Sequence, residues 1–359
     1  MKEEFPPKKL NRILRDAADG KTLSHDQAAC LLRLKRQRDI TSLHRTAREI
    51  RSRHFGSKVF LYGFLNFSTY CRNDCRFCGY RRSSGSRSRY RKEMPEIVEC
   101  ATKLAESGVH LLDLTAGEDP LLFKQNGASF GRILELVQKV KGATGLPIMV
   151  SPGAAPDDTI VRLRQHGADW FACYQETHNR ALFKTLRIGQ DYDRRLQKKI
   201  LAKNSGLFVE EGLLRGVGES VGDILTSLDR IKVLGADQVR VMTFVPQKGT
   251  PMGNETPPDD RQELIDIAVL RLIFPDRLIP ASLDVKGLAG LKARLDAGAN
   301  VVTSIVPPGK GLAGVAQRER DIENSGRSVR NLLPVVEECG LEPASVADYR
   351  NWIENRRKL

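Results

Sequence analysis

The most constraining feature of this 359-residue chain is a regular alternation of strand-like and helix-like segments from residue 59 onward. Short apolar stretches predict eight strands, at 59–66, 110–117, 147–151, 168–176, 207–217, 238–245, 277–284 and 300–306. Helical spacing predicts helices between them, at 95–107, 130–141, 157–166, 192–204, 221–234, 259–274 and 288–297. Such alternation favours a parallel sheet with crossover helices. Eight repeats over about 250 residues indicate an α/β fold of the closed (β/α)8 TIM-barrel type.

The segments before and after the barrel are expected to be helical extensions. Ser24-His-Asp-Gln27 is a capping-box pattern that precedes an apolar-periodic stretch. Helices are expected at 28–34, 41–53, 329–338 and 346–356. The expected division is therefore an N-terminal helical extension at 1–58, a barrel at 59–309 and a C-terminal helical extension at 310–359.

The net charge of +14 is concentrated in two places. Residues 1–58 hold 15 Lys and Arg against 7 Asp and Glu, and residues 81–92 hold six basic residues and no acidic one. Residues 93–359 are nearly neutral, with 35 basic and 36 acidic residues. We interpret the charge as a solvated helical face and a loop, with a nucleic-acid footprint as the alternative. A nucleic-acid partner is not expected, because the basic loop offers only Tyr90 for stacking on bases.

The chain carries no sign of secretion or of a membrane span. The first residues contain no apolar signal core, and no run approaches the roughly 18 apolar residues that a span needs. A soluble, cytoplasmic protein without a membrane partner is expected. The seven cysteines are odd in number and scattered, which does not suggest a disulfide framework.

Three of the cysteines are clustered as Cys71-Arg-Asn-Asp-Cys75-Arg-Phe-Cys78, directly after the first predicted strand. That position is the carboxyl end of a barrel strand, where barrel enzymes place their active sites. Thiolates are soft ligands suited to iron–sulfur clusters, zinc or copper(I). A [4Fe–4S] cluster held by three cysteines leaves one iron open, and a zinc loop completed by a distant Cys or His is the alternative. The other cysteines are expected to be buried small hydrophobes: Cys30, Cys100, Cys173 and Cys339.

The C-x3-C-x2-C spacing, with Phe77 before the last Cys, resembles that of the radical S-adenosylmethionine (SAM) enzymes. The resemblance implies that Cys71, Cys75 and Cys78 hold a [4Fe–4S] cluster whose open iron binds SAM. The reduced cluster would cleave SAM to a 5′-deoxyadenosyl radical, so no side chain is itself expected to be catalytic. The resemblance extends to elements around strands 2, 4 and 5, and implies these SAM contacts: Phe77, Ala116, Gly117, Glu118, Glu176, Arg195 and Gly216.

Longer stretches narrow the resemblance to one family. The segments 55–56, 60–71, 112–120, 173–179, 281–288 and 301–308 are similar to those of the methylornithine synthases of pyrrolysine biosynthesis. Biotin synthase and the hydrogenase maturases are more distant relatives. The resemblance implies an isomerase that converts L-lysine to (3R)-3-methyl-D-ornithine. In this reaction the radical removes a substrate hydrogen, and the carbon skeleton then fragments and recombines. An electron donor such as ferredoxin or flavodoxin is implied as well.

Strand parity gives a separate argument about the substrate, because side chains alternate between the two faces of a strand. The apolar neighbours of Asp113, Arg240 and Asp284 take the face toward the helices, so these charged residues and Ser282 are expected to point into the lumen. One cation and two carboxylates complement a diamino acid. Arg240 would bind its carboxylate, and Asp113 and Asp284 would bind its two ammonium groups. The resemblance places substrate contacts at the same positions, and Thr303 is a further lining candidate.

Three alternatives stay open from the sequence. A structural salt bridge between Arg240 and an aspartate would explain the inward charges without a substrate. A radical SAM enzyme of the biotin synthase or maturase kind would act on another small molecule. Sulfur insertion would need a second cluster, for which the remaining cysteines form no local motif. An RNA-binding or RNA-modifying protein would use the basic arm and loop.

Overall fold

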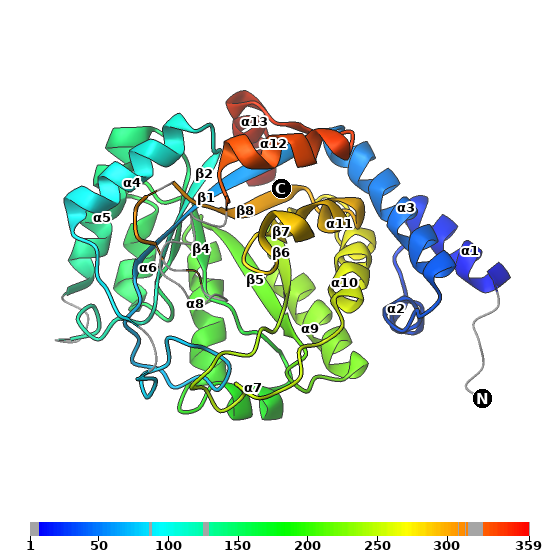
Figure 1. The fold of residues 1–359 in the computed structure, drawn as a ribbon, viewed down its shortest axis with the longest axis horizontal. Coiled ribbons are helices and arrows are strands. Elements are labelled where there is room, and N and C mark those ends of the chain that lie inside the picture. The colour runs from blue at the N-terminus through cyan, green and yellow to red at the C-terminus, as the bar shows by residue number, and fades with distance from the viewer. Residues whose placement is uncertain are drawn as a thin grey trace.

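The computed structural model describes residues 7–85, 88–124, 129–307, 309–312, 314 and 326–358. Eight strands form one parallel barrel sheet: β1(Lys58–Ser68), β2(Leu111–Ala116), β3(Ile148–Ser151), β4(Trp170–Ala172), β5(Phe208–Arg215), β6(Gln238–Thr243), β7(Pro280–Ser282) and β8(Val301–Ile305). Their order is β6-β5-β4-β3-β2-β1-β8-β7. A parallel bridge between Gln238 and Leu278 joins the two ends of this order. The predicted (β/α)8 barrel is therefore confirmed (Figure 1).

Helices cover the outside of the barrel between successive strands (Figure 1). They are α4(Met94–Glu106), α5(Gly131–Thr144), α6(Asp157–Leu163), α7(Arg180–Leu186), α8(Tyr192–Asn204), α9(Val221–Leu234), α10(Asp260–Ile273) and α11(Leu291–Asp296), with a 3₁₀ turn at Gly287–Gly290. The sequence predicts each of these helices except α7. Only two of its seven side chains, Phe183 and Leu186, are buried, so the segment shows little apolar periodicity. It begins where the Asn179 side chain accepts a hydrogen bond from the Leu182 amide.

The N-terminal arm forms three helices, α1(Pro7–Ala18), α2(His25–Leu32) and α3(Gln37–Phe55). The predicted capping box of Ser24 and Gln27 is present. Figure 1 shows α1, α2 and α3, in blue, beside α10. The arm is more than a solvated basic face, because Arg51 is buried and donates to the Leu295 carbonyl at 2.6 Å. Arg48 likewise donates to the Asp296 carbonyl at 2.8 Å, so part of the positive charge fastens the arm to α11.

The C-terminal segment adds α12(Val329–Glu338), a short strand β9(Glu342–Pro343) that pairs with β1, and α13(Val346–Arg357). Aromatic residues of α13 pack against residues at the amino ends of the strands. The Tyr349 ring lies 5.0 Å from Phe60, and the Trp352 ring is stacked 5.8 Å from Trp170. The Tyr349 hydroxyl also lies 2.7 Å from the Tyr62 hydroxyl. Helix α13 therefore closes the amino end of the lumen.

The two faces of the strands have different surroundings, as strand parity predicts. Leu112 and Leu114 belong to the main core between strands and helices, whereas Leu111 belongs to the cluster inside the barrel. Asp113 and Arg240 line a cavity in the lumen. The predicted inward direction of these two side chains is confirmed.

The basic loop at 81–92 makes structural contacts. Residues 86 and 87 of this loop lie outside the described residues. Arg89 donates to the carbonyls of Thr69, Tyr80 and Arg81. Arg91 pairs with buried Asp119 at 2.7 Å. Part of the positive charge of this loop is therefore used in structural contacts. Separately, none of the described helices combines the length and apolar composition that a membrane span requires.

Candidate active site at the carboxyl end of the barrel

The cysteine loop follows β1 and is fixed against the end of β2. At Gly117 a Cβ atom would lie 2.3 Å from the Tyr70 carbonyl oxygen and 3.0 Å from the Cys71 Cβ, so any larger residue would displace the loop. The Arg72 amide donates to the Glu118 carbonyl at 2.8 Å, and the Arg76 amide donates to the Leu186 carbonyl at 2.9 Å. The loop is thus held between β2 and α7.

The three clustered cysteines lie on this loop. Cys75 is buried, and Cys71 and Cys78 are half-buried. Burial raises the pKa of the Cys71 thiol, and burial with the neighbouring thiols raises the pKa of Cys78 to about 12. The Cys75 sulfur accepts a hydrogen bond from Gln190 Nε2 at 3.0 Å and a longer one from Arg187 Nη1 at 3.6 Å.

Glu118 and Arg195, two predicted SAM contacts, are brought together beside the cysteine loop. Arg195 Nη1 lies 3.1 Å from Glu118 Oε1, and Arg72 Nε lies 3.0 Å from Glu118 Oε2. Burial alone would raise the pKa of Glu118, but Arg195, the Ala154 amide and Arg72 outweigh it and hold that pKa below its usual range. Glu118 and Arg195 border a cavity of about 300 Å³ that also reaches Gln190.

Glu176 lies in the segment that follows β4 and has an unusual backbone conformation. Its φ is +68°, a left-handed value that non-glycine residues rarely adopt. The backbone is held by β5, since the Glu176 amide donates to the Gly212 carbonyl and its carbonyl accepts from the Leu214 amide. Its carboxylate pairs with Arg187 at 2.7 Å and lines the lumen, and burial raises its pKa. Strained residues that the surroundings hold in place cluster at functional sites.

The remaining predicted SAM contacts have clear structural surroundings. Phe77 packs against an apolar cluster that includes Leu186 and Phe244. Ala116 is buried at the end of β2. Gly216 has a φ of +86°, and a Cβ atom there would lie 2.4 Å from Pro258. Its amide donates to the Glu219 carboxylate at 2.9 Å, so residues 216–219 form a closed turn after β5.

A cavity of about 100 Å³ occupies the lumen. It lies well below the 300–1,000 Å³ of drug-sized sites, which favours a small ligand. Its lining includes the predicted substrate contacts Asp113, Arg240, Asp284 and Thr303, and also Tyr62, Tyr174, Glu176 and Ser304. Ser282 is not part of that lining, but its hydroxyl accepts a hydrogen bond from the Asp284 amide at 3.2 Å.

Arg240 has a different partner from the aspartate that the sequence suggests. Its Nε lies 2.7 Å from Glu210 Oε1, and its Nη1 donates to Thr303 at 3.0 Å. Burial alone would lower the pKa of Arg240, but Glu210 raises it above the usual value. Among the described residues, Nη2 of Arg240 makes no hydrogen bond. Glu210 was missed by the sequence reasoning, although parity on β5 places it on the lumen face with Phe208.

Asp113 retains one oxygen for a ligand. Its Oδ1 accepts hydrogen bonds from Thr115 at 2.8 Å and Ser151 at 2.9 Å, whereas Oδ2 has no hydrogen-bond partner among the described residues. Burial, followed by the negative charge of Glu210, raises the pKa of Asp113 to about 6. An ammonium group at Oδ2 would favour the ionised carboxylate.

Asp284 is already shared with two groups that the sequence reasoning missed. Arg327 Nη1 lies 3.0 Å from its Oδ1, and the Ser304 hydroxyl donates to its Oδ2 at 2.9 Å. Arg327 is fully buried and comes from the C-terminal segment. The Glu176–Arg187 pair adds no net charge to the lumen. When the others are ionised, three carboxylates and two guanidinium groups in and behind the lumen leave one net negative charge: Asp113, Glu210, Asp284, Arg240 and Arg327.

Comparison with known proteins decides the family. A model described as the radical SAM superfamily matches residues 65–231. The 3-methylornithine synthase of Methanosarcina acetivorans is 42% identical over 340 residues, which cover 95% of this chain and 96% of that protein. The chain belongs to the methylornithine synthase family of radical SAM proteins.

Solved structures and a second relative support this placement. A crystal structure of methylornithine synthase (PylB) matches with a TM-score of 0.89 and 42% identity, over 95% of this chain and 99% of that one. The [FeFe] hydrogenase maturase subunit HydE of Thermotoga maritima is 30% identical over 264 residues, 73% of this chain and 74% of that protein. The matches to the Methanosarcina acetivorans protein and to the PylB structure therefore cover nearly the whole length of this chain.

Radical SAM proteins use a [4Fe–4S] cluster and SAM, and the cysteine loop fits such a cluster. Among the described residues, no three His, Cys, Asp or Glu side chains are arranged around a single metal ion. A cubane cluster does not need that arrangement, because each thiolate binds a different iron. The Nε of Arg187 is buried beside the loop without a hydrogen-bond partner, which costs about 1–3 kcal/mol. An acceptor on a bound cofactor would remove that cost.

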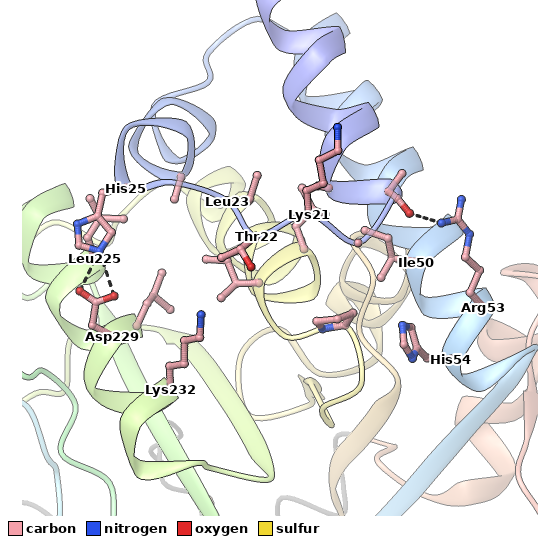
Figure 2. Close-up of a pocket in the computed structure, with 18 residues that line it drawn as sticks. Lys21, Thr22, Leu23, His25, Ile50, Arg53, His54, Leu225, Asp229 and Lys232 are labelled. Atoms are coloured by element: carbon pink, nitrogen blue, oxygen red, sulfur yellow. Dashed lines mark hydrogen bonds and ion pairs between the residues drawn. The ribbon is translucent and has the colours of Figure 1, made fainter.

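A larger cavity, about 350 Å³, lies away from this site, between the N-terminal arm and α9. Figure 2 shows His25 of the arm directed at Asp229 of α9, and its Nε2 lies 3.0 Å from Asp229 Oδ1. Arg53 at another edge of the cavity donates to the Ala18 carbonyl. None of the predicted site residues lines this cavity, so it contributes nothing to the assignment of the active site.

Proposed function

We propose that this protein is a radical SAM isomerase that converts L-lysine to (3R)-3-methyl-D-ornithine. The observation that carries the proposal is the charge pattern of the lumen. A small cavity is lined by one guanidinium, Arg240, and three carboxylates, Asp113, Glu176 and Asp284. Arg187 neutralises Glu176, so Asp113 and Asp284 are the carboxylates left for a ligand, and the buried charge set sums to −1. Lysine carries two ammonium groups and one carboxylate, a net charge of +1, and therefore complements it. The names of the similar proteins support the same reaction.

Arg240 is proposed to bind the substrate carboxylate. Glu210 and Thr303 hold its Nε and Nη1, so the guanidinium plane is fixed before substrate arrives. The free Nη2 is then the donor available to a ligand in the cavity. Charge-assisted bonds from a fixed guanidinium position a carboxylate with high specificity.

Asp113 and Asp284 are proposed to bind the two ammonium groups. Asp113 offers its unused Oδ2. Asp284 has fewer free positions because Arg327 and Ser304 already contact it, but a carboxylate has about four acceptor sites. Ser282 holds the Asp284 backbone, and Thr303 orients Arg240, so both act on the substrate through a neighbour.

The cofactors are proposed to occupy the carboxyl end of the lumen. Cys71, Cys75 and Cys78 would hold the cluster, and the SAM contacts would be the seven residues implied above, with Glu118, Glu176 and Arg195 as their charged members. When bound, the cluster and SAM supply the radical that starts the rearrangement. A ferredoxin or flavodoxin is the proposed electron donor.

The protein's own contribution is to hold and to shield. Because the substrate has charged groups on both sides of any bond that breaks, the fixed charges of Arg240 and Asp113 would keep both fragments in place. The aromatic cluster at α13 closes the amino end of the lumen, so water and competing hydrogen donors are excluded from that end.

The test is an anaerobic incubation of the reconstituted protein with SAM, a reductant and L-lysine. We expect 5′-deoxyadenosine and a product of unchanged mass that co-migrates with 3-methylornithine. The control is L-ornithine, which has the same charges and configuration on a chain one methylene shorter and should give less isomerised product. A fully loaded protein that cleaves SAM but leaves lysine unchanged would instead favour another small-molecule substrate, as in the maturase relatives.

A further inference from the structure

Two side chains from the loop between α7 and α8 contact a cysteine sulfur, and neither has a place in the function proposed above. Gln190 Nε2 lies 3.0 Å from Cys75 Sγ, and Arg187 Nη1 lies 3.6 Å from the same atom. Both donors come from a segment more than 100 positions away along the chain. Their convergence on one of three clustered cysteines therefore depends on the tertiary fold.

The orientation of the Gln190 amide is determined by its neighbours. Its Oε1 lies 3.4 Å from Arg195 Nη1 and 3.5 Å from Arg187 Nη1. A guanidinium can only donate hydrogen bonds, so the amide oxygen must face the two arginines. The Nε2 hydrogens are thereby directed toward the sulfur of Cys75.

The backbone of this segment is fixed on both sides. The Arg187 amide donates to the Phe183 carbonyl at 2.8 Å, and the Gln190 amide donates to the Arg187 carbonyl at 3.0 Å. The cysteine loop is joined to the same place by the bond from the Arg76 amide to the Leu186 carbonyl. Donors and sulfur therefore belong to one rigid assembly and need no rearrangement to meet.

We propose that Gln190 and Arg187 are positioning residues that set the reduction potential of the cluster through Cys75. Reduction adds negative charge to the cluster and its thiolates. Hydrogen bonds to a ligand sulfur and a buried guanidinium stabilise the reduced state more than the oxidised state, which raises the potential. The same two side chains extend to Glu176 and Arg195, so they connect Cys75 with two of the proposed SAM contacts.

The test is a redox titration of the reconstituted chain, followed by electron paramagnetic resonance, without SAM or lysine. Gln190→Leu removes the donor, and Gln190→Glu replaces it with an acceptor of the same shape. Arg180→Met is the matched control, because Arg180 is an exposed cation on α7 that pairs with Asp193. We expect about four irons per chain in all proteins. The midpoint potential should fall in both Gln190 variants, further in Gln190→Glu, and stay unchanged in the control.

Unchanged potentials in fully loaded Gln190 variants would overturn the proposal. Loss of iron from both variants would also overturn it, because the residue would then hold the cluster rather than tune it. The inference rests on the proposed function only for the presence of the cluster. Since the titration contains no lysine, its failure is distinguishable from a failure of the proposed reaction, which the product assay reports separately.

Discussion

The two ends of the barrel lumen are built from the same strands but have opposite chemistry. At the amino end, Phe60, Tyr62 and Trp170 pack with α13 into an aromatic plug. The same cluster includes Leu111 of β2 and Phe208 of β5. Two residues further along these two strands are Asp113 and Glu210, which lie in the lumen with Arg240 of β6. Strand parity determines whether a side chain points into the lumen. Its position along the strand determines whether its neighbours there are aromatic or charged. Substitutions at the two ends should therefore separate stability from substrate recognition.

The largest effect is expected from Arg240→Met at the charged end. Removing this partner leaves buried Glu210 uncompensated, which should cost about 3–5 kcal/mol of unfolding free energy. Loss of a charged substrate contact should also lower kcat/KM for lysine roughly 30-fold to several-thousand-fold. Urea unfolding and the product assay measure the two effects.

The double variant Arg240→Met/Glu210→Gln separates these contributions. It removes the uncompensated charge, so most of the stability should return while lysine turnover stays low. Arg261→Met, which removes an exposed ion pair with Asp259, is the control and should change neither quantity. Recovery of turnover in the double variant would show that Arg240 serves only to neutralise Glu210.

A smaller effect is expected from Asp113→Asn, and it should depend on pH. Because the pKa of Asp113 is raised to about 6, its ionised form is lost as pH falls below that value. For the unsubstituted protein, kcat/KM for lysine should fall about tenfold per pH unit below about pH 6. The variant should be roughly 100-fold less active at pH 8 and should lack this limb of the profile.

The raised pKa of Asp113 affects stability and activity in opposite directions: as pH rises through about 6, activity increases and the free energy of unfolding decreases. The folded state favours protonated Asp113, so its contribution is fully present below the unfolded pKa near 3.8 and is lost as pH rises through about 6. Asp113→Asn should therefore be more stable than the parent at pH 8 and less active. A variant that is destabilised at pH 8 would contradict the assignment of Asp113 as a buried carboxylate kept for function.

The smallest effect is expected at the aromatic end, from Tyr349→Phe. The change leaves the Tyr62 hydroxyl without its 2.7 Å partner and should cost about 1–3 kcal/mol in stability. The KM for lysine should not change, because the substitution lies outside the cavity. Tyr62→Phe/Tyr349→Phe should recover part of the stability. A raised KM in Tyr349→Phe would mean that the two ends are not independent. The double variant tests stability alone, because Tyr62 also lines the cavity.

The sequence predicted the barrel and the inward charges because both follow from local periodicity. Eight apolar stretches with helices between them specify the topology, and alternation on β2 and β6 specifies the direction of Asp113 and Arg240. The ion pairs were harder, because they depend on which strands become neighbours. Glu210 pairs with Arg240 only because β5 and β6 are adjacent at that level.

Other parts of the site left no local signal in the sequence. Arg327 belongs to the C-terminal segment, and no periodic pattern connects it with Asp284. Gln190 and Arg187 lie in a short loop, and their contact with Cys75 depends on where the cysteine loop packs in the folded protein. The plug by α13 was also unforeseen, since an amphipathic helix does not reveal which opening it covers.

The closure of the tube by α13 has a consequence for how the molecule is made. The hydrogen-bond partner of Tyr62 is Tyr349, 287 positions later in the chain. The strands can therefore pair before α13 covers the amino end of the barrel. A chain interrupted before α13 would contain every cysteine and every lumen charge, yet the amino end of its lumen would be open to solvent. In this protein, solvent is excluded from the amino end of the lumen by α13, a helix that follows all the proposed site residues in the sequence.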